Sequence, residues 1–126
     1  MCVLLVEDEP LILLDIAEAI EEAGHEVLPA RNGTVALSAI ERHPGRFSAL
    51  VTDHRMPGGI FGSELAAVMR QAYPEIPIII VTGTPADIPP EFQTRHRLKV
   101  LSKPYQAGSV IRELPEPKRR RLGMSQ

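Results

Sequence analysis

Five short apolar runs, separated by segments with helical periodicity, constrain the fold of this chain more than any other feature. The runs are CVLLV, HEVLPA, SALVT, IPIIIVT and LKVL, and most of them are continuous rather than alternating. Continuous apolar runs are typical of strands that are buried on both faces of a parallel sheet. Because 126 residues suit one domain, we predict a single α/β domain with a doubly wound, five-stranded parallel sheet and helices on both faces.

Helices are predicted between the apolar runs. The first follows Pro10 and stops at Gly24, the second runs from Gly33 to Arg42, and the third from Gly62 to Ala72; a last helix, after the final run, extends from about Gln106 to Leu114. In the third of them, Leu65, Val68, Met69 and Ala72 recur at helical spacing and are expected to face the core. The alternation of strand and helix implies right-handed crossovers.

The C-terminal part of the chain is less regular. Three prolines interrupt the segment from Thr84 to Arg97, so a helix there is expected to be short, to begin near Pro90 and to lie in a mobile region. We place the domain at residues 1–114 and a tail at residues 115–126. The tail carries a basic cluster at 118–121, and we expect a solvated, disordered end rather than a site for an acidic partner.

Composition argues against some classes of protein. The net charge of −2 and the 44% of hydrophobic residues give no case for binding nucleic acid or a membrane. Cys2 is the only cysteine, so an internal disulfide is not possible. The first residues, MCVLLVEDEP, lack the basic leader of a signal peptide. We therefore expect a cytoplasmic protein without nucleic acid or membrane partners.

Polar side chains follow the predicted strands at their carboxyl ends. They are Glu7, Asp8, Asp53, Thr82 and Lys103. In an open parallel sheet, ligands bind beyond these ends. Carboxylates that lie close together repel one another unless they hold a cation, and ligation by oxygen alone favours a hard ion such as Mg²⁺. The sequence therefore predicts a magnesium site at this edge of the sheet.

Asp53 ends a buried strand and is followed at once by a rigid loop, HRMPGG. An aspartate beside Mg²⁺ can attack phosphorus and form an aspartyl phosphate. Phosphoryl transfer needs mainly positioning and neutralisation of charge, which Mg²⁺, the Lys103 ammonium and the Thr82 hydroxyl could supply. We expect the loop to bring the backbone carbonyl of Arg55 round to the metal.

Each of these residues has an ordinary structural interpretation when it is taken alone. Asp8 or Glu9 could cap a helix, and Asp53 could be a turn residue. Thr82 could be a strand residue and Lys103 a solvated charge. The combination favours a site, because all of the residues fall at carboxyl ends of predicted strands and none at amino ends.

Four motifs, VEDEP, TDHRMPGG, VTG and SKPY, give the chain a resemblance to the receiver domain of bacterial two-component response regulators, from Val3 to about Leu114. The resemblance implies a flavodoxin-like sheet with the strand order 2-1-3-4-5. It also implies residue roles: Glu7 and Asp8 as the acidic metal pair, Asp53 as phosphoacceptor and metal ligand, Thr82 as the switch hydroxyl, and Lys103 as the phosphate-binding lysine. The bond between Lys103 and Pro104 is expected to be cis, as is typical of the family.

Several positions depart from the usual receiver pattern. Most receivers have a glycine eight residues after the phosphoacceptor, but Phe61 stands there and Gly62 comes one later, so the loop is one residue longer. Stand-alone receivers and those associated with hybrid kinases have a similar loop. Val100 stands where many receivers have an aromatic switch residue that is coupled to Thr82. Tyr105 could take a signalling role or be buried against the sheet.

The resemblance implies a single-domain response regulator. It would take a phosphoryl group from a histidine kinase or a histidine phosphotransfer protein onto Asp53 with Mg²⁺, and signal through protein contacts. It would catalyse its own phosphorylation and dephosphorylation without being a conventional enzyme. Arg55 and Thr84 occupy positions that tune the lifetime of the phosphoryl group in this family.

Other functions remain as alternatives. One is a receiver fold used for docking without phosphorylation, and another is a receiver domain excised from a hybrid histidine kinase. A flavin-binding module is disfavoured, because VEDEP puts acids where the flavin phosphate would bind. A haloacid-dehalogenase-like phosphatase is disfavoured, because Arg55 stands where that family requires a second aspartate.

Overall fold

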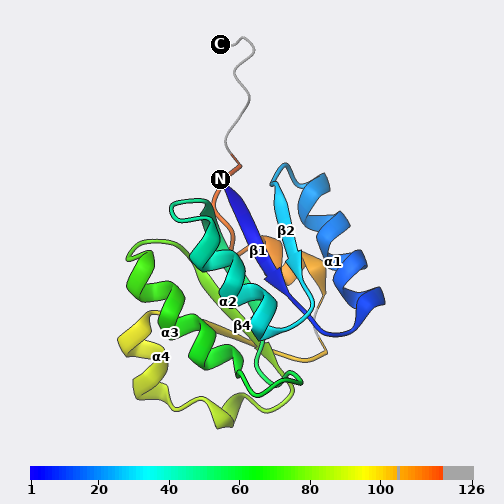
Figure 1. The fold of residues 1–126 in the computed structure, drawn as a ribbon. Helices are drawn as coiled ribbons and strands as arrows, with labels where there is room; N and C mark the ends of the chain where they lie inside the picture. The colour runs from blue at the N-terminus through cyan, green and yellow to red at the C-terminus, as the bar shows by residue number, and fades with distance from the viewer. Residues whose placement is uncertain (105, 118–126) are drawn as a thin grey trace.

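In the computed structural model, which describes residues 1–104 and 106–117, five parallel strands form a sheet in the order β2-β1-β3-β4-β5 (Figure 1). The strands are β1 (Cys2–Val6), β2 (Val27–Ala30), β3 (Phe47–Asp53), β4 (Ile78–Thr82) and β5 (Lys99–Ser102). The parallel direction and the order of the strands confirm the predicted fold class.

Helices connect successive strands, and one more helix follows the last strand. They are α1 (Pro10–Glu22), α2 (Gly33–Arg42), α3 (Gly62–Ala72), the short 3-10 helix η1 (Pro85–Asp87), α4 (Pro90–His96) and α5 (Ala107–Ile111). The short helix predicted near Pro90 is confirmed as α4. Helix α5 is shorter than predicted, because Glu113 and Leu114 donate to carbonyls three residues earlier and the chain leaves the helix in tight turns.

The sheet separates two hydrophobic cores. Leu4 and Val6 of β1 face the core beneath α2, α3 and α4, whereas Val3 and Leu5 face the core beneath α1 and α5. This alternation follows from the two-residue period of a strand. In Figure 1, α1 accordingly lies on one side of the sheet and α2, α3 and α4 on the other. Burial on both faces explains why the strand sequences are continuously apolar.

The face of α3 that meets the core differs from the predicted one. Met69 is buried as predicted, but Val68 is 42% exposed and Ala72 is exposed, since the buried stripe includes Ala66 and Arg70 instead. The Arg70 guanidinium donates hydrogen bonds to the backbone carbonyl oxygens of Tyr73, Ile76, His96 and Arg97. A charged side chain can be buried here because these carbonyls satisfy its donors.

The strand register brings the polar residues to one edge of the sheet. Val6 pairs with Thr52, and Asp53 pairs with Val81, so Glu7 and Asp53 lie at neighbouring strand ends. Thr82 pairs with Ser102, which places Lys103 just beyond the next strand. The carboxyl ends of β1, β3, β4 and β5 therefore form one site.

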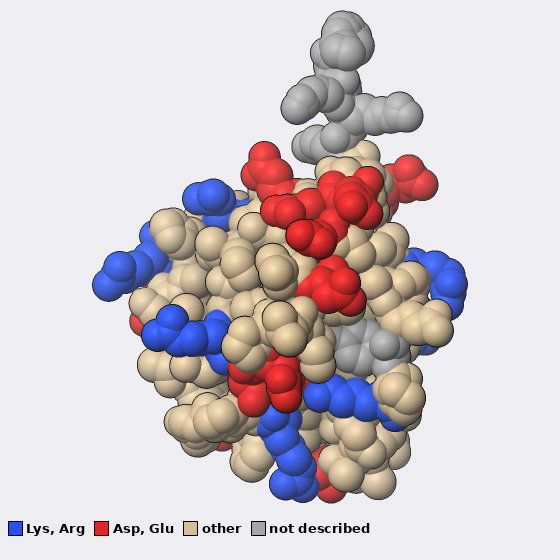
Figure 2. Space-filling view, turned by 90° about the vertical axis from the view of Figure 1, so that its right-hand side faces the viewer, with Lys and Arg blue, Asp and Glu red and all other residues tan. Residues whose placement is uncertain are grey.

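The face that carries α1 bears a concentration of acidic side chains toward one end (Figure 2). The exposed acids of α1 are Asp15, Glu18, Glu21 and Glu22. Such a surface would repel a polyanion at that place. Within the described residues, none of the helices combines the length and the apolar character needed to cross a membrane.

Two of the predictions fall outside the described residues. They concern the role of Tyr105 and the basic cluster at 118–121.

Leu114 is buried in the core beneath α1 and α5, and Pro117 lies beside Gly24.

Candidate functional site

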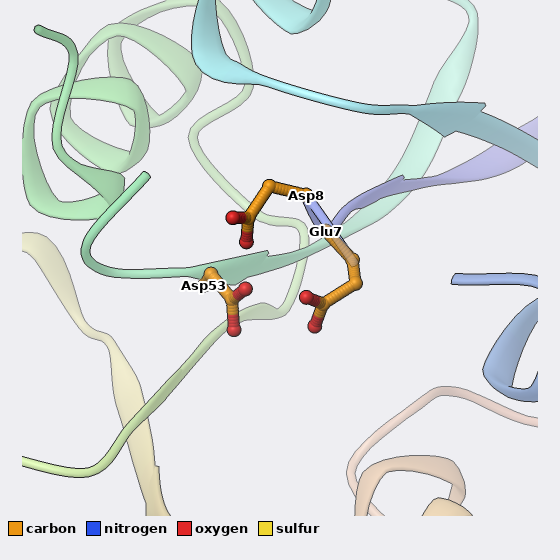
Figure 3. A group of neighbouring side chains, drawn as sticks. All are labelled: Glu7, Asp8 and Asp53. Atoms are coloured by element: carbon orange, nitrogen blue, oxygen red, sulfur yellow. The ribbon is translucent and has the colours of Figure 1, made fainter. Parts of the chain in front are cut away.

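Three carboxylates converge at the carboxyl edge of the sheet. Glu7 and Asp8 follow β1, and Asp53 ends β3 (Figure 3). Each offers one oxygen, and these oxygens lie within 4.8 Å of one another. Glu7 and Asp53 are both only 2% exposed, whereas Asp8 is partly exposed. Strand pairing thus forces two buried acids and one accessible acid into one small volume.

Burial perturbs the ionisation of the two inner carboxyls. Removal from water, together with the neighbouring Asp53 carboxyl, raises the pKa of Glu7 to about 7. Burial also raises the pKa of Asp53, although contacts with Glu7 and Lys103 oppose the rise. The backbone N–H of Glu9 donates to Glu7 Oε2 at 3.1 Å and favours the charged form of Glu7. The two acids therefore compete for ionisation.

Lys103 supplies the positive charge of the site. Its Nζ lies 3.0 Å from Asp53 Oδ1, and its backbone N–H donates to the carbonyl of Thr82 at 2.9 Å. Burial alone would lower the pKa of Lys103, but the contact with Asp53 outweighs this effect and raises it. The peptide bond between Lys103 and Pro104 is cis. The ammonium is therefore charged at neutral pH and held next to the Asp53 carboxylate.

The carboxylate cluster fits a hard cation. Apart from the ion pair with Lys103, neither oxygen of the buried Asp53 carboxylate receives a hydrogen bond from the described residues. Buried polar atoms in proteins are normally hydrogen bonded or bound to an ion. Three carboxylates against one ammonium also leave an excess of negative charge. This set of oxygen donors suits a divalent ion such as Mg²⁺.

Thr82 lies at the same edge, but it is bonded to the loop that follows β4. Its Oγ1 accepts the backbone N–H of Thr84 at 3.0 Å and lies 3.3 Å from Thr84 Oγ1. Thr84 Oγ1 in turn donates to Asp87 Oδ2 at 2.9 Å. Arg55, from the loop after β3, forms an ion pair with the same Asp87 oxygen. These hydrogen bonds, led by that of Arg55, lower the pKa of Asp87.

The longer loop after Asp53 is accommodated by its glycines. Gly62 touches the end of β3: a Cβ there would lie 2.1 Å from the carbonyl oxygen of Asp53, and the Gly62 N–H donates to the carbonyl of His54 at 2.6 Å. Gly58 and Gly59 have φ of +99° and +87°, which favour glycine. The extra residue is therefore taken up before Gly62, which begins α3 in close contact with β3.

The additional aromatic residue of this loop, Phe61, has a structural partner. Its ring stacks on that of His54, with the two ring centroids 5.3 Å apart. His54 is 6% exposed, and its burial lowers the pKa of the imidazole. Phe61 therefore covers the residue that follows Asp53.

The family model for the response regulator receiver domain matches residues 3–114 of the chain. This chain belongs to the response regulator receiver domain family. The receiver is 29% identical over 110 residues to the response regulator protein FleR of Pseudomonas aeruginosa, an alignment that covers 86% of this chain and 23% of that protein. It is 34% identical over 109 residues to a response regulator receiver protein of Anaeromyxobacter sp., covering 86% of this chain and 44% of that protein.

Solved structures agree with this membership. The receiver domain from the hybrid histidine kinase CckA matches with a TM-score of 0.72 and 26% identity, over 89% of this chain and 94% of that one. By contrast, the chain spans less than half the length of the two curated relatives. The similarity to these relatives therefore concerns their receiver domains and not their other parts.

The structure brings together most of the site residues that the sequence suggested. Glu7, Asp8, Asp53 and Lys103 meet at one point, and Thr82 lies on the neighbouring strand end. A role of the Arg55 carbonyl as a metal ligand stays a prediction.

Sequence reasoning missed Asp87 and the close packing of Gly62. Asp87 stands in the proline-rich segment after β4, where its sequence neighbours carry no signal of a contact with Arg55. The sequence shows that Gly62 stands one residue later than the usual receiver glycine, but its contact with Asp53 depends on how α3 begins.

Proposed function

We propose that this receiver accepts a phosphoryl group on Asp53 from a phosphorylated histidine of a histidine kinase or histidine phosphotransfer protein, in a reaction that requires Mg²⁺. The observation that carries the proposal is the Asp53 carboxylate itself. It is 2% exposed, it accepts no hydrogen bond from the described residues apart from the ion pair with Lys103, and it lies beside two other acids. A buried carboxylate that is held by one ammonium and by no other hydrogen-bond donor of the described residues suits a nucleophile better than a structural role.

The chemistry is a transfer between two nucleophiles. An Asp53 oxygen forms a bond to phosphorus, the bond between phosphorus and the imidazole nitrogen breaks, and its electron pair stays on the imidazole. When bound, Mg²⁺ supplies neutralisation of the phosphoryl charge. Glu7, Asp8, Asp53 and the backbone carbonyl of Arg55 would hold it. Lys103, whose Nζ lies 3.0 Å from Asp53 Oδ1, would pair with a phosphoryl oxygen.

Dephosphorylation would occur at the same edge, when water attacks the aspartyl phosphate. Arg55 and Thr84 stand on the two loops that border Asp53 and would control the approach of that water. The Thr82 hydroxyl would contact the phosphoryl group and shift the receiver between two conformations. We infer that the output is a contact with another protein in the cytoplasm, with neither nucleic acid nor membrane as partner.

Intact-mass analysis after incubation with acetyl phosphate tests the proposal. With Mg²⁺, the wild-type protein should gain one phosphoryl group, and without Mg²⁺ it should gain none. Asp53→Asn should gain none under either condition. Asp15→Asn provides the matched control, because Asp15 is an exposed acid on α1 and should leave the adduct unchanged.

The outcome separates phosphorylation from docking. If the wild-type protein forms no adduct with Mg²⁺ present, the phosphoacceptor function is wrong and a receiver fold used only for docking becomes the better description. An adduct that persists in Asp53→Asn would place the phosphorylated residue elsewhere and would equally overturn the assignment.

A further inference from the structure

A single carboxylate oxygen links the two loops that border the phosphorylation site. Asp87 Oδ2 accepts Arg55 Nε at 3.1 Å, pairs with Arg55 Nη2, and accepts Thr84 Oγ1 at 2.9 Å. Arg55 lies on the loop after β3, and Thr84 lies on the loop after β4. Asp87 therefore ties together two segments that neighbouring strands deliver to the same edge.

The link continues to the switch hydroxyl. The backbone N–H of Thr84 donates to Thr82 Oγ1 at 3.0 Å, and the two hydroxyl oxygens lie 3.3 Å apart. Thr82 is only 4% exposed. Among the described residues, no hydrogen bond joins Thr82 to Asp53, and the Thr82 hydroxyl is bonded to Thr84 instead. A hydroxyl held in this way must leave Thr84 before it can approach a group on Asp53.

Asp87 is itself held on a fixed piece of backbone. Its N–H donates to the carbonyl of Thr84 at 3.0 Å, which closes the turn of η1. The next residue, Ile88, is 1% exposed in the core beneath α3 and α4, and its carbonyl accepts Gln93 Nε2 at 2.9 Å. The Asp87 carboxylate therefore extends from an anchored turn, and it can act as a fixed point for Thr84.

We propose that Asp87 is a positioning residue that keeps the Thr82 hydroxyl in its resting orientation through Thr84. Asp87 thereby opposes the engagement of Thr82 with a phosphoryl group on Asp53 and lowers the affinity of the site for such a group. The inference rests on the proposed function of Asp53. It adds a residue that sets how readily the switch leaves its resting state.

The ion pair between Arg55 and Asp87 does not by itself explain the role proposed for Asp87. The Arg55 and Asp87 side chains are 64% and 34% exposed, and an ion pair of that exposure contributes little to stability. What distinguishes Asp87 is that the oxygen that pairs with Arg55 also accepts the Thr84 hydroxyl. The expected effect of its removal is therefore on the orientation of Thr84 and Thr82 rather than on folding.

Titration with beryllofluoride, a phosphoryl analogue, in the presence of Mg²⁺ tests the inference. Asp87→Ala should bind beryllofluoride about two- to fivefold more tightly than the wild-type protein, a modest change because the network is partly exposed. Thr84→Val removes only the bridging hydroxyl at nearly constant shape and should have the same effect. Because the two residues act in series, the double variant should match the single variants rather than multiply their effects.

Glu91→Ala provides the matched control, since Glu91 is an exposed acid at the start of α4 and should leave the affinity unchanged. Unchanged affinity in Asp87→Ala overturns the inference. A gain in Asp87→Ala without a gain in Thr84→Val also overturns it, because Asp87 would then act through Arg55 alone.

Amide hydrogen exchange of Thr84 in the protein without ligand gives a second, independent readout. Asp87→Ala should speed the exchange of this amide about threefold or more, because the Thr84 N–H then holds Thr82 Oγ1 less firmly. An unchanged exchange rate contradicts the positioning role. If the wild-type protein fails to bind beryllofluoride, the proposed function fails, while the exchange rate still decides the role of Asp87.

Discussion

Gly62→Ala should strongly destabilise the protein, although it adds only one methyl group. An added Cβ would lie 2.1 Å from the carbonyl oxygen of Asp53 and 2.9 Å from its carbonyl carbon. Real Cβ atoms do not approach backbone atoms within 3.0 Å, so either α3 or the end of β3 must move. Neither can do so easily, because the Gly62 N–H also donates to the carbonyl of His54 at 2.6 Å.

The expected cost follows from this geometry. Overpacking a well-packed interior costs about 1–3 kcal/mol, and a clash with backbone belongs at or above the upper end of that range. We therefore expect the free energy of unfolding to fall by about 3 kcal/mol or more, which corresponds to a loss of roughly 12 °C in Tm for a domain of this size. Since the clash acts on Asp53, the affinity for Mg²⁺ should fall as well.

Urea denaturation followed by circular dichroism measures the effect, and Gly108→Ala is the matched control. Gly108 is also helical, but among the described residues no atom outside its own helix backbone and chain neighbours lies within 4 Å of the position of its Cβ. Alanine there should leave stability unchanged or raise it by up to about 1 kcal/mol, because alanine favours the helix. If Gly62→Ala unfolds at the same urea concentration as the wild-type protein or as Gly108→Ala, the argument from close packing is wrong.

Two further predictions concern other parts of the molecule. Since the pKa of Glu7 is raised from 4.5 to about 7 on folding, the metal-free protein should lose up to about 3 kcal/mol of stability as the pH rises from 4.5 to 7. Urea denaturation at pH 5.0 and 7.5 should show this loss, and Glu7→Gln or saturating Mg²⁺ should reduce it; equal stability of the wild-type protein at both pH values would contradict it. Tyr73→Phe removes the hydroxyl that accepts the backbone N–H of Arg46 at 2.9 Å and of Phe47 at 3.4 Å. The free energy of unfolding should fall by about 1–2 kcal/mol, and an unchanged value would show that these donors find other partners.

Much of the fold could be predicted because it is encoded locally. The strands are continuous apolar runs, the helices between them begin at a proline or a glycine, and α1, α2 and α3 end shortly before one. The prediction failed in detail for α3, where Val68 is exposed and Arg70 is buried. In a sequence pattern, an arginine predicts a surface position. Arg70 can be buried only because backbone carbonyls accept hydrogen bonds from its guanidinium.

In the candidate site, too, some features could be predicted from the sequence and others could not. Glu7, Asp8, Asp53 and Lys103 could be picked out from sequence, because a parallel sheet must bring the carboxyl ends of its strands to one edge. The partner of Thr82 could not be predicted. Thr82 bonds to Thr84 and, through Asp87, to Arg55, which lies 32 residues away from Asp87 in the chain.

The sequence by itself determined which elements form, in what order, and which polar residues stand at the strand ends, since these depend on periodicity and on neighbours in the chain. The tertiary structure alone decided that Gly62 lies against Asp53, that Arg70 is buried, and that Asp87 joins two loops. The contacts of Arg70 and Asp87 connect segments that are distant in sequence, and the geometry of all three contacts exists only once strand register and helix packing have fixed the distances between backbones.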